Sequence, residues 1–352
     1  MKYFISKGHT VFSITFPKKN IKPRGINGIT NIQLPDIMLN RIYMLKRVAF
    51  IWHIYKITKE LKLEIFHVVN AESVILAAFS SSKKTVMENQ GSDVLRTPNQ
   101  YPWLKIIYKI FYNYVDAVIQ DSKIAQEAGL KYGAPKENNE VIEIGIDFTI
   151  FNKYVKKGVA RKKLNLNQNI PFVFSSRGMK EIYNIDIIMK SIPKVKNIFP
   201  DVKIVFSSNY GNLSEDIKQF VNSNNLKNNI IWTGWLNHEL EMPYYYCDAD
   251  VVVSIPSSDS SPFSVYEAIA TKTPVIVSDL PWLKGKFIPG KHLISVPIRD
   301  EIALSDEIIR ILKGDSVIDL KEAYNIVFDK INVVKENDKL EKLYNKIIDN
   351  RK

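Results

Sequence analysis

Short apolar runs alternate with longer segments of helical periodicity along the first half of the chain. Runs of four to six residues rich in Val, Ile and Phe are typical of strands buried on both faces of a parallel sheet. The expected strands are Val11–Phe16, Glu64–Val69, Lys84–Met87, Ala117–Gln120 and Val141–Ile144. The expected helices between them are Arg41–Leu61, Trp103–Tyr114 and Ser122–Tyr132.

The same alternation returns in the second half, after a basic and polar stretch that follows Phe151 and indicates a linker. The basic residues of this stretch are Lys153, Lys156, Lys157, Arg161 and Lys162. The expected strands beyond it are Phe172–Ser175, Lys203–Ser207, Ile230–Thr233, Asp250–Ser254 and Val275–Val277. Strand–helix alternation in two blocks predicts an α/β protein with two doubly wound, Rossmann-like domains, residues 1–152 and 153–336. In such domains ligands bind at the carboxyl ends of the strands.

Composition agrees with a soluble globular protein. Of the 352 residues, 45% are hydrophobic and 24% are charged. No apolar run approaches the ~20 residues of a membrane span, and Met1-Lys2 does not lead into a signal-peptide core, so we expect a cytoplasmic protein. A single cysteine, Cys247, excludes a disulfide within the chain, and the five histidines are scattered. We therefore expect no metal.

The net charge of +12 favours phosphorylated ligands, anionic lipid or nucleic acid as partners. No nucleic-acid motif accompanies the charge, so we expect no nucleic-acid partner. Basic and aromatic residues are interleaved in Arg41–Leu61 and in Tyr101–Tyr114, a combination that favours the membrane interface. The alternative is that the aromatic rings pack on the sheet and the lysines are solvated.

The segment Ser258–Trp282 carries the clearest candidate chemistry. Asp259 and Glu267 stand eight positions apart, with a short polar loop and the start of a helix between them. Ser261 is a suitable N-cap and Pro262 suits the first helical position. The N–H groups at such a helix start bind phosphate, and a carboxylate accepts the hydroxyl hydrogens of a ribose. The alternative is an ordinary strand-to-helix turn with surface acids.

This segment resembles the C-terminal signature of the retaining family 4 (group 1) glycosyltransferases. The matching positions are Glu267, Ala268, Ala270, Pro274, Val275 and Asp279, whereas Asp259 and Lys272 stand where the family usually has Glu and Gly. Further similar steps are Gly91-Ser92-Asp93, Asp116–Ser122, Gly145-Ile146-Asp147 with Phe151, Arg177 with Tyr183–Asp186, and Gly234. The resemblance implies a GT-B fold, in which two doubly wound domains face each other and a last helix, about 337–352, crosses back onto the first.

The resemblance also implies roles for individual residues. Arg177 would stabilise the departing diphosphate, with Lys180 as a stand-in for the family's lysine, whose place Tyr183 takes. Asp259 would contact the transferred sugar, and Glu267 would hold the ribose. The other donor-side residues implied are Gly234, Ser261, Phe263, Ser264 and Val265.

In the first domain the resemblance points to the loop that contains Gln90, Ser92 and Asp93. Gln90 replaces a histidine that lies close to the transferred sugar in the family, and its alternative role is a loop-packing amide. Ser92 and Asp93 would lie on the acceptor side, although Asp93 is equally suited to capping the next helix. One departure is larger. Lys2–Val11 resembles the end of the family's first helix and the start of its second strand, so the first strand and its glycine-rich loop have no counterpart, and we expect an unpaired sheet edge.

Taken with the resemblance, the sequence predicts a retaining transfer from a UDP- or GDP-linked sugar to a glycan or lipid-linked glycan, without cofactor or metal. Peripheral membrane contact by the first domain would suit such an acceptor. The alternatives are a non-catalytic or truncated module that binds nucleotide sugar, and a GT-B epimerase that releases a free sugar nucleotide.

Overall fold

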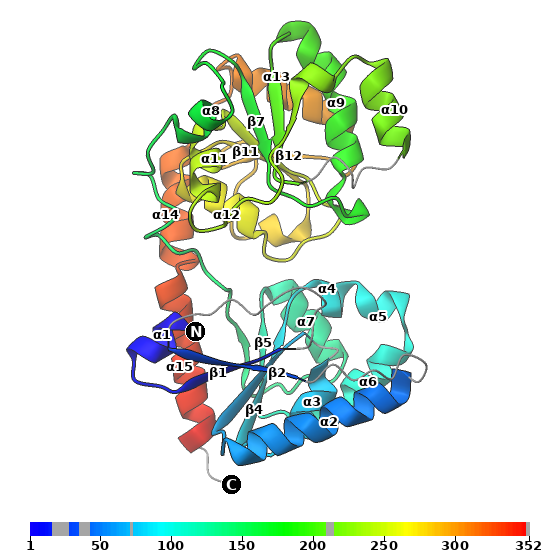
Figure 1. Cartoon of the computed structure of the whole chain (residues 1–352), viewed down its shortest axis with the longest axis vertical. Coiled ribbons are helices and arrows are strands. Elements are labelled where there is room, and N and C mark those ends of the chain that lie inside the picture. The colour runs from blue at the N-terminus through cyan, green and yellow to red at the C-terminus, as the bar shows by residue number, and fades with distance from the viewer. Residues whose placement is uncertain (16–27, 35–42, 71–72, 209–214, 350–352) are drawn as a thin grey trace. The chain divides into compact units, whose positions relative to one another are not determined.

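A computed structural model describes residues 1–15, 28–34, 43–70, 73–208 and 215–349. The chain divides into two compact units (Figure 1), each built from parallel strands and helices. The N-terminal unit comprises Met1–Glu143 with Glu336–Lys352, and the C-terminal unit comprises Ile144–Lys335. The predicted α/β class with two Rossmann-like domains is confirmed.

The described residues of the C-terminal unit form a six-stranded parallel sheet in the order β12-β11-β10-β7-β8-β9. Its strands are β7 (Phe172–Ser175), β8 (Lys203–Phe206), β9 (Ile230–Trp232), β10 (Val251–Ser254), β11 (Val275–Ser278) and β12 (Ile294–Val296). Its helices are α8 (Val159–Lys163), α9 (Ile185–Ile198), α10 (Glu215–Ser223), α11 (Met242–Asp248), α12 (Phe263–Ala270), α13 (Glu301–Leu312) and α14 (Leu320–Lys330). Short 3₁₀ turns occupy Glu181–Tyr183, Lys227–Asn229 and Pro281–Leu283.

Successive residues of the central strand β10 enter two different cores. Val251 and Val253 lie in the apolar cluster on one face of the sheet, and Val252 lies in the cluster on the other face. Helices therefore cover both faces, and this burial explains why the strand reads as a continuous apolar run. The carboxyl end of β10 is at Ser254, and the candidate loop Asp259–Ser261 follows it.

The described residues of the N-terminal unit form two separate parallel ladders, β3-β4-β5-β6 and β1-β2. The strands are β1 (Val11–Thr15), β2 (Ile29–Gln33), β3 (Ile65–Val69), β4 (Lys84–Asn89), β5 (Ala117–Gln120) and β6 (Asn139–Val141). The helices are α1 (Lys2–Ser6), α2 (Tyr43–Glu60), α3 (Val74–Ala78), α4 (Ser92–Leu95), α5 (Thr97–Gln100), α6 (Trp103–Phe111), α7 (Lys123–Lys131) and α15 (Val333–Asp349), with a 3₁₀ turn at Tyr112–Tyr114. Within this described part, β1 pairs only with β2 and β3 pairs only with β4, so each keeps one edge without a ladder partner.

The first helix and the last helix pack together in the N-terminal unit. The Tyr3 hydroxyl donates to Asp338 Oδ1 over 2.5 Å and lies 2.6 Å from Glu341 Oε2. The ring of Phe4 lies 5.4 Å from that of Tyr344. Because these contacts join residues more than 330 positions apart, α15 is an integral part of this unit.

Several strand predictions need correction. β2 and β12 were not predicted, and the strand expected at Val141–Ile144 is instead β6, which ends at Val141. β2 has only two apolar residues, Ile29 and Ile32, among its five positions, and β12 is only three residues long, so neither gives a strong apolar run. Phe16, Arg41 and Ile42, which the predictions also included, lie outside the described residues.

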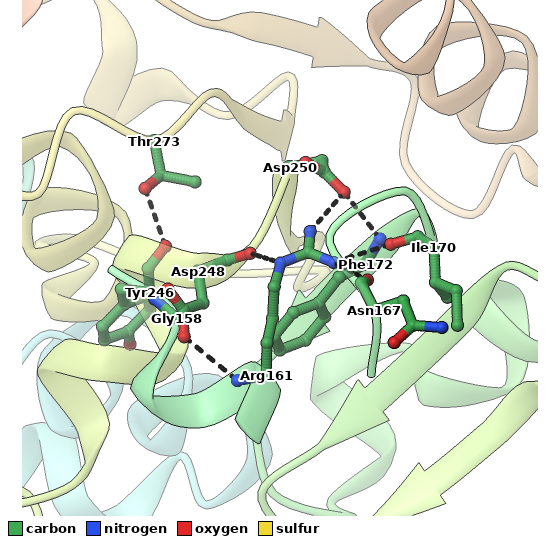
Figure 2. A network of polar contacts seen from close by, with 9 residues as sticks. All are labelled: Gly158, Arg161, Asn167, Ile170, Phe172, Tyr246, Asp248, Asp250 and Thr273. Atoms are coloured by element: carbon green, nitrogen blue, oxygen red, sulfur yellow. Dashed lines mark hydrogen bonds and ion pairs between the residues drawn. The ribbon is translucent and has the colours of Figure 1, made fainter. Parts of the chain in front are cut away.

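The stretch predicted as a linker is partly folded structure, because Arg161 is only 4% exposed and belongs to α8. Figure 2 shows its guanidinium held by backbone and side-chain oxygens. Nε donates to Asp248 O (3.1 Å) and Nη2 donates to Asp250 Oδ2 (2.9 Å). Nη1 donates to the carbonyl oxygens of Asn167 (3.2 Å) and Ile170 (2.7 Å).

The Asp248 carboxylate caps the start of the same helix. Gly158, in the left-handed region at φ +85°, precedes Val159, and its N–H donates to Asp248 Oδ1 over 2.5 Å. The N–H of Ala160 donates to Asp248 Oδ2 over 2.7 Å. A carboxylate at a helix N-terminus satisfies free N–H groups and faces the positive end of the dipole. Asp248 and Arg161 thus hold α8 against the C-terminal end of α11 and the start of β10.

Candidate functional site

Arg177 lies just beyond the carboxyl end of β7 and makes three directed contacts. Its Nε donates to Ser254 Oγ over 2.9 Å, and its Nη2 donates to Asp259 Oδ2 over 2.5 Å. The carbon at the centre of its guanidinium lies 5.2 Å from the centroid of the Tyr183 ring. The guanidinium is therefore oriented before any ligand binds, with an anion already at its fork.

The start of α12 meets this arginine through Ser254. The Oγ atoms of Ser254 and Ser264 are 3.2 Å apart, so the end of β10 and the first turn of α12 share one hydrogen-bonded cluster with Arg177. Both serines are buried. The cluster lies at the carboxyl ends of β7 and β10, where open α/β sheets bind their ligands.

The helix start differs by one residue from the sequence prediction. α12 begins at Phe263, with Pro262 as its N-cap and no side-chain capping bond, whereas Ser261 was expected as the N-cap. The Val265 N–H bonds to Pro262 O over 3.0 Å and is thereby occupied. The N–H groups of Phe263 and Ser264 are those that the helix geometry leaves without an acceptor within the helix. The predicted phosphate cradle of three N–H groups is thus reduced to two.

Glu267 lies one turn into α12, and its side chain is 5% exposed. Its Oε1 is 2.5 Å from Nε2 of His238, on the segment between β9 and α11. The hydrogen bond that His238 donates to the Glu267 carboxylate raises the pKa of His238, against the opposing effect of burial. The sequence did not indicate this pair, because the two residues are 29 positions apart and His238 fits no motif.

Tyr246, from α11, connects the two halves of the cluster. Its hydroxyl donates to Ser176 Oγ over 2.8 Å. Burial raises the pKa of Tyr246 well above its usual value, and the charges of both Glu267 and Arg177 act on the same hydroxyl. Ser264, which joins the Arg177 cluster, and Glu267 lie three positions apart on α12 and therefore on neighbouring parts of one helix surface.

The remaining donor-side candidates surround this cluster. Lys180 is exposed at the start of the 3₁₀ turn that contains Tyr183 and has no ion-pair partner within the described residues. Gly234 follows β9 in the left-handed region at φ +71°, and its N–H donates to Ser208 O over 3.3 Å. The ring of the neighbouring Trp232 stacks on that of Phe206, with 4.8 Å between the ring centroids.

Gln90, Ser92 and Asp93 lie together in the N-terminal unit, where Gln90 follows β4 and Ser92 and Asp93 begin α4. The buried Asp93 accepts from the Gln90 N–H over 3.2 Å, which favours its role in holding this turn. Gln90 Nε2 donates to Glu88 Oε1 over 3.4 Å, and Ser92 Oγ is 3.5 Å from Gln90 O. Their roles toward sugar or acceptor stay predictions.

The C-terminal cluster is suited to binding a nucleoside diphosphate. A guanidinium and two helix-start N–H groups are donors for phosphate oxygens, and a buried carboxylate one turn away accepts hydroxyl hydrogens. The described residues contain no group of three or more His, Cys, Asp or Glu that could hold a metal ion. The same part of the chain contains no helix with the length and apolarity that crossing a membrane requires.

The fold and this cluster define the GT-B class of glycosyltransferase structures. Two family models match the chain: "Glycosyl transferases group 1" over residues 156–325 and "Glycosyl transferase 4-like" over residues 1–122. Together they cover most of the sequence, and the chain belongs to the group 1 glycosyltransferases. Sucrose-phosphate synthase from Thermosynechococcus elongatus has a similar structure, with a TM-score of 0.83, 18% identity and coverage of 99% of this chain and 91% of that chain.

Two curated relatives are similar in sequence. Alpha-monoglucosyldiacylglycerol synthase from Streptococcus pneumoniae is 25% identical over 229 residues, which is 59% of this chain and 51% of the relative. The chain therefore spans about half the length of that relative. The UDP-Gal:alpha-D-GlcNAc-diphosphoundecaprenol alpha-1,3-galactosyltransferase from Escherichia coli is 24% identical over 338 residues, which is 90% of this chain and 84% of the relative.

Proposed function

We propose that this protein is a retaining glycosyltransferase that moves a sugar from a nucleotide-sugar donor, UDP- or GDP-linked, to a glycan or lipid-linked glycan. The observation that carries the proposal is the single cluster formed by Arg177, the start of α12 and Glu267. It supplies positive charge for a diphosphate and a carboxylate for the attached ribose. Family membership and the GT-B fold support the same reading.

The chemistry required at this cluster is stabilisation of the leaving group. As the bond between sugar and phosphate breaks, negative charge builds on the diphosphate and the sugar gains oxocarbenium character. The Arg177 guanidinium and the N–H groups of Phe263 and Ser264 would bind the departing phosphate oxygens. Asp259 would face the positively charged sugar, and Glu267 would hold the ribose. In this scheme positively charged protein groups neutralise the departing diphosphate in place of a metal ion, so no cofactor is needed.

The names of the relatives bear on donor and acceptor. The relative from Escherichia coli is named for UDP-Gal and a diphosphoundecaprenol-linked acceptor, and both relatives are named for alpha-linked glycosides of lipids. An alpha product is what retention yields from a donor whose sugar is alpha-linked. We therefore favour UDP over GDP and a lipid-linked acceptor over a soluble one. Such an acceptor would be met by a cytoplasmic enzyme in peripheral contact with the membrane.

Two measurements test the proposal. Calorimetry with UDP and GDP should show binding that is strongly weakened in Arg177→Ala and Glu267→Ala. Transfer from a UDP-sugar to a lipid-linked acceptor should fall at least about tenfold in each variant, with the anomeric configuration of the product read by NMR. Asp216→Ala and Lys162→Ala, exposed on the same unit, are the matched controls.

Four outcomes would count against the proposal. A loss of less than tenfold in both variants would remove the assigned roles, and an inverted product would remove retention. Nucleotide binding without transfer to any lipid-linked acceptor would instead favour the non-catalytic alternative. Release of a free epimerised sugar nucleotide, without acceptor, would favour the epimerase.

A further inference from the structure

The outward face of α6 is apolar, although it lies on the surface of the N-terminal unit. Trp103, Ile106, Ile110 and Tyr114 follow one another at helical spacing from α6 into the adjoining 3₁₀ turn, and each is between 49% and 65% exposed. We call these four residues the α6 face. Surface helices normally place polar residues on the side that faces solvent.

The opposite side of α6 already fills the core of its unit. Leu104 and Tyr108 are buried there, and the Tyr108 hydroxyl donates to Asp93 O over 3.2 Å. Lys105 and Lys109 are the only polar residues among WLKIIYKIF apart from the hydroxyl of Tyr108 and the indole N–H of Trp103. Apolar residues therefore extend from the buried side of the helix onto its exposed side, which marks the α6 face as a contact surface.

The charged residues of the segment that contains this face have a single sign. No Asp or Glu occurs from residue 94 to residue 115, whereas Arg96, Lys105 and Lys109 lie in this stretch. The ammonium group of Lys105 lies 5.9 Å from the Tyr132 ring, and Arg96 and Lys109 are exposed. The α6 face is thus an apolar strip with cations beside it and no acids of its own segment.

A second helix of the same unit repeats this combination. Trp52 and Tyr55 are exposed on α2, with the ammonium groups of Lys56 and Lys59 each 5.6 Å from one of the two rings. α2 packs on α3, and α3 packs on α6, so the three helices lie alongside one another (Figure 1). No acid occurs from residue 41 to residue 59.

We propose that the α6 face docks on an anionic phospholipid bilayer, with Ile106 and Ile110 entering the acyl boundary and Lys109 contacting lipid phosphates. Trp103 and Tyr114, at the two ends of the strip, have the amphipathic rings that sit at headgroup level. Combined apolar and basic contact is what binds an interfacial helix to an anionic membrane. The inference rests on the proposed function only in that a lipid-linked acceptor gives the docking its purpose.

A second copy of the chain suits this face less well. A two-fold contact through α6 would bring Lys105 and Lys109 of one copy against the same residues of the other, with no acid from the segment to offset them. Anionic headgroups offset the same charges. Charge complementarity therefore selects the bilayer.

Co-sedimentation with vesicles tests the inference. The full chain should pellet with phosphatidylcholine vesicles that contain phosphatidylglycerol, and much less with pure phosphatidylcholine or at high salt. The double variant Ile106→Ser/Ile110→Ser should lower partitioning at least about tenfold, because two side chains no longer enter the acyl region. Lys109→Gln should lower it about fivefold on anionic vesicles.

The matched controls come from the C-terminal unit. Ile302, on α13, is 64% exposed against 65% for Ile106, and Lys162 is exposed like Lys109. Ile302→Ser and Lys162→Gln should leave partitioning within about twofold of the unmodified chain. Circular dichroism and UDP binding, expected to be unchanged in every variant, show that folding is intact.

The outcomes separate the two proposals. Binding of UDP with no vesicle binding, or with vesicle binding that Ile106→Ser/Ile110→Ser leaves intact, overturns the docking surface and spares the proposed function. Self-association in analytical ultracentrifugation that this double variant abolishes overturns it in favour of a second copy. Vesicle binding of the expected kind in a chain that binds no nucleotide supports the surface and contradicts the proposed function.

Discussion

Arg177 and Asp259 form an ion pair in the C-terminal unit, with 2.5 Å between Nη2 and Oδ2. Each side chain is only 15% exposed, so the pair is largely shielded from solvent. Ser254 and Tyr183 hold the rest of the guanidinium. A diphosphate that binds Arg177 must therefore compete with a carboxylate that already occupies the fork, and donor affinity is a difference between the two contacts.

This competition predicts opposite effects of Asp259→Asn on binding and on transfer. The amide keeps the shape but removes the competing charge, so UDP should bind about threefold to tenfold more tightly in calorimetry. Transfer should fall at least about tenfold, because the charge that would face the oxocarbenium-like sugar is lost. Asp216→Asn, an exposed acid on α10, is the control. Weaker UDP binding in Asp259→Asn would show that Asp259 positions Arg177 rather than competing for it.

The guanidinium of Arg177 lies over the ring of Tyr183, with its central carbon 5.2 Å from the ring centroid. Tyr183→Phe keeps the ring and should leave UDP affinity within about twofold. Tyr183→Ala removes it and should weaken UDP binding about threefold to fivefold, the size expected for a partly exposed cation–π contact. Equal affinities for the Phe and Ala variants would mean that the ring does not orient the arginine.

The ion pair of His238 and Glu267 should make stability depend on pH. The pKa of His238 is raised in the folded protein by its hydrogen bond to Glu267, so folding favours the protonated form. The resulting stability is fully present below the unfolded value of about 6.5 and is lost as pH rises through the higher folded value. Because His238 is 56% exposed, the contribution of this ion pair to the free energy of unfolding is at most about 1 kcal/mol.

Thermal melts of the unmodified chain and of His238→Gln measure this effect. The difference in melting temperature should be largest just below pH ~6.5 and should shrink toward higher pH. In the background of Glu267→Gln the same histidine substitution should give a difference that no longer varies with pH. A difference that grows with rising pH would contradict the raised pKa of His238.

The sequence predicted those parts of the fold in which one local pattern decides the outcome. β5 and β7 match the predicted bounds residue for residue, because strands buried on both faces leave an unbroken apolar run. β2 has two apolar residues among five and is held in place by its pairing with β1, so it left no such run.

The candidate site divides in the same way. Arg177, Asp259 and Glu267 were found because each follows a strand or lies in a motif along the chain. His238 and Tyr246 reach the same cluster from segments that no local pattern connects to it. The ion pair between Arg177 and Asp259, 82 positions apart, likewise depends on the order of β7 and β10 in the sheet.

The Arg161 network predicts a large loss of stability from one substitution outside the site. Arg161→Met removes the hydrogen bonds to Asp248 O, Ile170 O and Asp250, and leaves the buried Asp248 O and the partly buried Ile170 O without this donor. The free energy of unfolding of the C-terminal unit should fall by about 3 kcal/mol. Urea unfolding, followed through the tryptophan fluorescence of this unit, gives the value.

The neighbouring Lys162 supplies the control, because it is exposed in the same helix and carries the same charge. Lys162→Met should change the free energy of unfolding by no more than about 0.5 kcal/mol. The contrast between the two variants separates the buried network from the general effect of removing a cation. Equal losses of unfolding free energy in both variants would show that the hydrogen bonds in Figure 2 do not hold α8 in place.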